Sequence, residues 1–151
     1  MLQNGPAWFL LADGRRARVL IEERRGAALQ APGEWEMEIG PEEIYEPQDR
    51  PPRGFASVGG GRHAIDRGTT LHEQEESKFL KRVAERIAEA DKRKQFEHLV
   101  IAAPPRALGA LRELLPHGAR ARIRAETPKD LIDENESSLR ERLRDLLRKA
   151  S

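Results

Sequence analysis

Cysteine is absent from this chain of 151 residues. The protein therefore has no disulfide bonds, no thiolate metal ligands and no cysteine nucleophile. No stretch approaches the about 20 consecutive apolar residues that a membrane-spanning helix needs. The first residues, MLQNGPAW, also lack the basic and then apolar pattern of a secretory signal. From these absences we expect a cytoplasmic protein that does not enter a membrane.

A strong net charge is lacking too, because 27 basic residues are balanced by 26 acidic ones, giving +1. The molecule as a whole is not a polycation, so any affinity for nucleic acid must come from a local basic patch. Charged residues make up 35% of the chain, but the apolar residues recur periodically, which argues against disorder. The length predicts a single domain over residues 1–151.

Short apolar runs and two-residue alternation predict five strands. These are residues 7–12, 16–22, 34–39, 98–103 and 119–126. Asp13-Gly14 predicts a hairpin between the first two, because glycine tolerates the positive φ of such turns. Residues 27–31 are an alternative third strand, but 34–39 is preferred because its apolar residues alternate with glutamates. In 119–126, arginines alternate with apolar residues, which predicts one solvated face.

Three helices are predicted from apolar stripes at helical spacing. The first covers about residues 70–94 and begins with a Thr-x-x-Glu capping box. The second begins at Pro105, where proline is tolerated in the first turn, and the third follows Asp133, which is expected to cap it. The order β-β-β-α-β-α-β-α predicts an α/β fold in which helices pack on a mixed five-stranded sheet. This order is similar to that of ribonuclease-H-like domains.

Residues 41–69 form a long segment rich in proline, glycine and arginine, directly before the first helix. Long irregular stretches inside compact domains are often functional. Between residues 50 and 68 there are four arginines and one aspartate. Arginine forks suit phosphate oxygens, and glycine lets the backbone approach a ligand closely. The predicted RNA-binding residues are Arg50, Arg53, Gly59, Gly60, Gly61, Arg62, His63 and Arg67. No cofactor and no metal ion are expected there.

The ribonuclease-H-like order also raises the hypothesis of a metal-dependent nuclease or hydrolase, whose carboxylates must converge on two cations. The candidate acids are Asp13, Glu75, Glu76, Asp133 and Glu134. The first strand contains no acid, and the fourth ends in Ala-Ala-Pro-Pro, so catalysis is the less favoured alternative. The four histidines show no metal-binding spacing.

Two stretches carry a family resemblance, WFLLADGRRARVLIEE at 8–23 and HLVIAAPPRALGALRELL at 98–115. The pattern joins a strand ending in Ala-Asp-Gly to Arg-Ala-Arg-Val, and later shows Ala-Pro-Pro-Arg-x-Leu-Gly. It resembles the bacterial family called "protein required for attachment to host cells", and the resemblance covers most of the chain. It implies a role in host-cell attachment, which is either direct or indirect.

A more distant resemblance is to the middle domain of archaeal and eukaryotic peptide-chain release factors. In those factors a Gly-Gly-Gln loop precedes a long helix and enters the ribosomal peptidyl-transferase centre. Here Gly59-Gly60-Gly61-Arg62-His63 occupies the same place, but the glutamine used in ester hydrolysis is absent. The resemblance therefore implies a non-catalytic module that docks to the ribosome or another structured RNA, in stalling, hibernation or rescue. It carries no prediction of the oligomeric state.

Overall fold

The computed structural model describes residues 4–44 and 70–150. In this part of the chain five strands form one mixed sheet in the order β3-β2-β1-β4-β5. The strands are β1 (Ala7–Ala12), β2 (Arg16–Glu22), β3 (Glu36–Glu38), β4 (His98–Ala102) and β5 (Ile123–Thr127). β1, β2 and β3 form an antiparallel meander, whereas β4 pairs in parallel with both β1 and β5. The predicted α/β fold with a mixed five-stranded sheet is confirmed.

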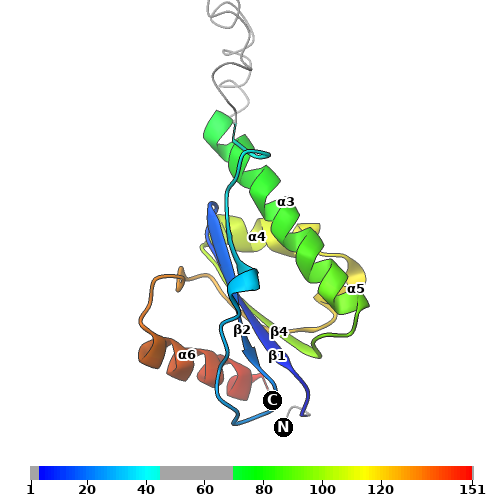
Figure 1. Ribbon diagram of the computed structural model, residues 1–151, viewed down its shortest axis with the longest axis vertical. Helices are drawn as coiled ribbons and strands as arrows, with labels where there is room; N and C mark the ends of the chain where they lie inside the picture. The colour runs from blue at the N-terminus through cyan, green and yellow to red at the C-terminus, as the bar shows by residue number, and fades with distance from the viewer. Residues whose placement is uncertain (1–3, 45–69, 151) are drawn as a thin grey trace, which may run out of the picture.

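Helices cover both faces of the sheet (Figure 1). The helices of the described residues are α3 (Leu71–Lys92), α4 (Pro105–Leu114), α5 (His117–Arg120) and α6 (Glu136–Lys149), with the short 3-10 helix η1 (Gly33–Trp35) before β3. The first three lie on one face, and α6 lies alone on the other. The helix α5 was not predicted, because the proline and glycine near residue 117 were expected only to end α4.

The two hydrophobic cores explain why β1 is apolar along its whole length. Trp8 and Leu10 of β1 point into the core beneath α3 and α4, whereas Phe9 and Leu11 point into the core beneath α6. A strand that is buried on both faces reads as a continuous apolar run rather than an alternating one. None of the described helices is long and apolar enough to cross a membrane.

The hairpin between β1 and β2 forms as predicted, but for a different reason. Oδ1 of Asp13 accepts hydrogen bonds from the backbone amides of Arg15 and Arg16, each at 2.7 Å. Gly14 is not among the described glycines with a positive φ, which are Gly5 and Gly26. The Asp13 side chain thus holds the turn in place of a left-handed glycine. A Cβ on Gly14 would meet only the end of the flexible Glu76 side chain, at 2.6 Å from its Cδ.

The start of β5 differs from the prediction. The strand begins at Ile123 rather than at residue 119, because residues 117–120 form α5. Its register with β4 shifts after Leu99, which is typical of a β-bulge. The bulge sends Ile123 toward one core and Ala125 toward the other, and all five strand residues are half-buried. The predicted division into one buried and one solvated face is therefore wrong.

The two long helices show one correct and one wrong cap prediction. At α3 the capping box is complete, because Thr70 Oγ1 accepts from the amide of Glu73 at 3.0 Å and Glu73 Oε1 accepts from the amide of Thr70 at 2.8 Å. At α6 the cap is Asn135, whose Oδ1 accepts from the amide of Ser138 at 2.9 Å. Asp133 does not cap this helix and binds Arg16 instead.

Candidate functional site

All eight predicted RNA-binding residues lie between residues 45 and 69, outside the described part of the chain. They are Arg50, Arg53, Gly59, Gly60, Gly61, Arg62, His63 and Arg67. The structure does describe the surface around Ile44 and Thr70, the two residues that border this range. We call that surface, made by residues 13–15, 39–44 and 70–77, the flanking surface. It lies at the end of the molecule where α3 begins (Figure 1).

Residues 39–44 are fixed to α3 by a buried ion pair. The carboxylate of Glu43, which is only 4% exposed, receives two hydrogen bonds from the Arg82 guanidinium, at 2.8 and 3.0 Å. The amide of Gly40 adds a third at 2.7 Å, and Nη2 of Arg82 also donates to the carbonyl of Glu38 at 2.8 Å. Arg82 holds the pKa of Glu43 below its usual range, so this carboxylate is ionised at neutral pH. The last residues before the range 45–69 therefore have a defined position on α3.

The return of the chain into α3 is fixed in a similar way. Glu73 closes the capping box of α3 with one oxygen, and its other oxygen is bonded by Arg106. Because Arg106 is in the first turn of α4, Glu73 ties together the first turns of two helices. Both flanks of the range 45–69 are thus held by α3. The residues before the range are bound to Arg82 on the side of the helix, and Thr70, which follows the range, is bound to the first turn.

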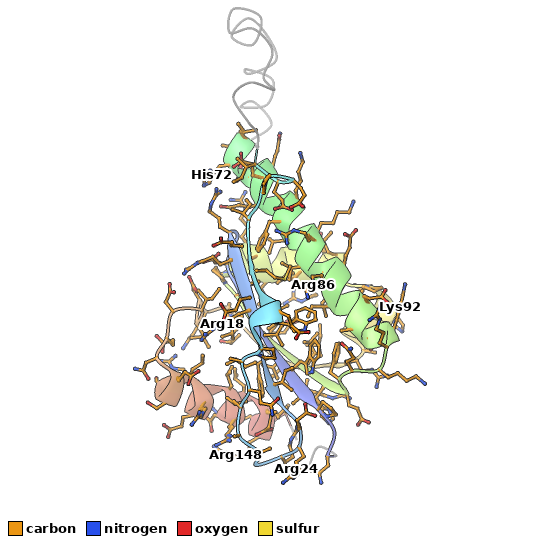
Figure 2. The ribbon with its side chains drawn as sticks, in the orientation of Figure 1. Arg18, Arg24, His72, Arg86, Lys92 and Arg148 are labelled. Carbon is orange, nitrogen blue, oxygen red and sulfur yellow. The ribbon has the colours of Figure 1, made fainter. Side chains whose placement is uncertain are left out.

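The β1–β2 turn completes the flanking surface. The amide of Ile39 donates to the carbonyl of Arg15 at 2.8 Å. The guanidinium of Arg15 contacts His72 at 3.2 Å and Glu75 at 3.7 Å, both on the first turns of α3. His72 itself is exposed at the start of this helix (Figure 2). The arrangement brings together basic and acidic groups from three segments that are distant in the sequence.

A cavity of about 420 Å³ opens beside this surface, between α3 and α4. Its lining consists of Gly14, Glu73, Glu76, Ser77, Leu80, Pro104, Arg106, Ala107 and Ala110. Gly14 and Pro104 follow the carboxyl ends of the parallel strands β1 and β4, which is where ligands bind in many open α/β sheets. Most of this lining is apolar, and two of its charged side chains, Glu73 and Arg106, pair with each other.

The candidate nuclease acids do not converge on a cation site. Arg16 bridges two of them, because its guanidinium reaches Oδ2 of Asp13 at 3.0 Å and Oδ1 of Asp133 at 2.8 Å. The hydrogen bond from Arg16 also lowers the pKa of Asp133. The other described candidates pair separately, Glu75 with Arg15, Glu76 with His72, and Glu134 with Arg142. Within residues 4–44 and 70–150, no group of three or more His, Asp or Glu side chains could hold a metal ion.

The Glu43–Arg82 pair is the part of the site that the sequence did not reveal. The two residues are 39 positions apart, and the intervening range 45–69 has no helical or strand periodicity. Charged residues next to a stretch without periodicity are predicted to lie on the solvated surface. No short motif signals that one of these glutamates is buried, so only the folded chain shows the contact.

The fold places this chain in a known class of α/β domain. An archaeal translation termination factor of known structure superposes on it with a TM-score of 0.50 at 13% sequence identity, over 95% of this chain and 37% of that protein. A second structure, described as an archaeal protein, gives a TM-score of 0.47 at 12% identity, over 95% and 36%. The chain thus spans little more than a third of either protein. A search of curated proteins finds no match.

The family is defined by the sequence. Residues 8–143 match the family described as "Protein required for attachment to host cells", and the chain belongs to that family. Both resemblances, to this family and to the release-factor fold, are confirmed. The match extends across the range 45–69 and includes both of its anchored flanks.

Proposed function

We propose that this protein is a non-catalytic, cytoplasmic binding module that contacts structured RNA, and ribosomal RNA first, through the segment at 41–69 and its arginine-rich stretch at 50–68. The observation that carries the proposal is the anchoring of the two flanks. The Glu43–Arg82 pair fixes the residues that precede the range 45–69, and the capping box at Thr70 fixes the residues that follow it. A rigid platform lowers the entropic cost of ordering a binding segment on its partner.

The chemistry of the segment favours a phosphate-rich partner. It contains four arginines, at 50, 53, 62 and 67, and the forked N–H donors of each guanidinium group suit the oxygens of a phosphate. The shared fold adds support, because the superposed archaeal protein is a translation termination factor. The segment has no glutamine after its glycines, so the proposed role is docking in stalling, hibernation or rescue of translation rather than peptide release.

The proposal is tested by co-sedimentation of the protein with ribosomes at low and high salt. The ribosomes are purified from the cells that naturally produce the protein. Phosphate contacts release counterions, so we expect the bound fraction to fall steeply as salt rises. A variant with Arg50, Arg53, Arg62 and Arg67 changed to Ala is expected to lose binding. The matched control changes Arg24, Arg140, Arg142 and Arg148 to Ala, which removes the same charge from exposed positions elsewhere.

Two results contradict the proposal. One is the absence of wild-type co-sedimentation with ribosomes or either subunit at every salt concentration. The other is equal binding by the segment variant and the control variant, since binding would then follow total charge and not the segment. Circular dichroism of each variant shows whether its fold is intact before binding is compared.

The family description favours a second candidate function, attachment to host cells. A direct adhesin must lie on the cell surface, whereas a cytoplasmic RNA-binding module affects attachment only indirectly. Treating intact cells with a protease that cannot enter them separates the two cases. Loss of the protein from intact cells supports direct attachment, and its survival until the cells are lysed supports an indirect role.

A further inference from the structure

The end of α3 that is remote from the flanking surface is joined to α5 and to the residues before β5. Asp91, in the last turn of α3, pairs through Oδ1 with Nε of Arg122 at 3.3 Å. A Cβ placed on Gly118 of α5 would lie 3.1 Å from Oδ2 of the same carboxylate. One carboxylate is therefore enclosed by two segments that follow α4, and it holds them against α3.

Basic residues gather around this junction. Residues 89–98 and 117–124 together carry six basic and three acidic side chains, in a chain whose net charge is only +1. Four of these cations are exposed. Arg93 pairs with Glu89, and the other three are Lys92, Lys94 and Arg120. None of the three forms an ion pair with any residue in the part of the chain that the structure describes. We call these three residues the distal patch.

The distal patch is separate from the flanking surface. The helix α3 has 22 residues, which corresponds to about 33 Å at about 1.5 Å per residue. Lys92 lies at the end of α3 opposite to His72, beside α5 (Figures 1 and 2). At physiological salt, charges about 8 Å apart or more are largely screened from each other. The patch therefore acts on a partner by its own contacts, independently of the charged groups of the flanking surface.

We propose that the distal patch is a second contact with the sugar-phosphate backbone of the RNA that the segment binds. The inference rests on the proposed function and gives it a second, remote contact point. A protein partner fits less well, because protein interfaces have cores rich in aromatic residues and poor in lysine. The exposed large apolar residues of the described chain are only Ile44 and Leu114, so a membrane surface also lacks the apolar contacts it needs.

A second contact with the RNA has a measurable consequence for affinity. Each phosphate contact adds about 0.7 to 0.9 to the slope of log K against log salt concentration. Loss of the three cations of the distal patch is expected to lower that slope by about 2 to 3. Residual binding by the segment remains, so the variant binds more weakly and with less sensitivity to salt, rather than not at all.

The test uses the full chain, fluorescently labelled, with purified ribosomes as the probe, in a salt titration. The patch variant carries Lys92→Gln, Lys94→Gln and Arg120→Gln. Its matched control carries Arg24→Gln, Lys78→Gln and Lys129→Gln, which removes three exposed cations from scattered positions. Thermal unfolding of both variants is recorded as well, because cations in the last turn stabilise a helix. Poly-glutamate serves in parallel as a probe for an acidic protein partner.

The inference and the proposed function fail in different ways. If the wild type binds ribosomes and the patch variant keeps the slope of the control, the distal patch is not a contact, although the proposed function stands. If the wild type does not bind at all, both fail. A patch variant that loses binding to poly-glutamate but keeps its ribosome slope assigns the patch to an acidic protein and overturns the inference.

Discussion

The ion pair between Glu43 and Arg82 allows the sharpest test of the structural argument, through the substitution Glu43→Gln. Glutamine keeps the shape of the side chain but removes the charge from a site that receives three hydrogen bonds. Breaking a buried ion pair costs about 3 to 5 kcal/mol. The Arg82 side chain is 32% exposed, so water hydrates part of it when its partner loses its charge. We therefore expect the free energy of unfolding to fall by about 2 kcal/mol, which is about the contribution of one hydrogen bond to a charged group.

The same pair predicts a dependence of stability on pH. Arg82 lowers the pKa of Glu43 in the folded protein below the ordinary value of 4.5. The contribution of the charged pair is therefore fully present above about pH 4.5 and is lost as pH falls through the lower, folded-state pKa. The difference in unfolding free energy between wild type and Glu43→Gln should be constant at neutral pH and should shrink in acid.

Urea unfolding of both proteins at several pH values measures this difference. A loss of about 2 kcal/mol corresponds to a fall in melting temperature of roughly 6 °C for a chain of this size. Hydrogen exchange adds a local readout, because the amide of Gly40 should exchange faster in the variant than in the wild type. Equal stability at neutral pH, or a difference that stays constant down to pH 3, would refute the reasoning.

Two further substitutions test the turn and the second core. Asp13→Ala should lower the free energy of unfolding by about 1 to 2 kcal/mol, because two backbone amides lose their acceptor. Asp13→Asn keeps that acceptor and should retain most of the stability. Equal losses in the two variants would contradict the account of the turn. Leu143→Ala should lower the free energy of unfolding by about 3 kcal/mol in urea unfolding, because this side chain of α6 is fully buried. Leu146→Ala, at a partly buried position of the same helix, should cost less. A larger loss for Leu146→Ala than for Leu143→Ala would show that α6 packs by another face.

Local patterns in the sequence were sufficient for most elements of the fold, although not for α5. The continuous apolar run at β1 and the Thr-x-x-Glu box at α3 depend on contacts within a few residues or on simple burial, and both are confirmed. The same local reasoning failed at β5 and at Asp133. In each case a partner from another element decided the outcome. For β5 it was the bulge in its pairing with β4, and for Asp133 it was the guanidinium of Arg16.

The predicted binding residues were chosen from composition, and they lie outside the described residues, so the segment at 41–69 stays a prediction. Charge, glycine content and a resemblance are properties that a linear chain reveals by itself. The contacts that join distant parts of the chain are different in kind, because the Glu43–Arg82 pair and the Asp91–Arg122 pair each join residues more than 25 positions apart. The free energy of such contacts depends on burial and on mutual geometry, and both arise only when the sheet and its helices have packed.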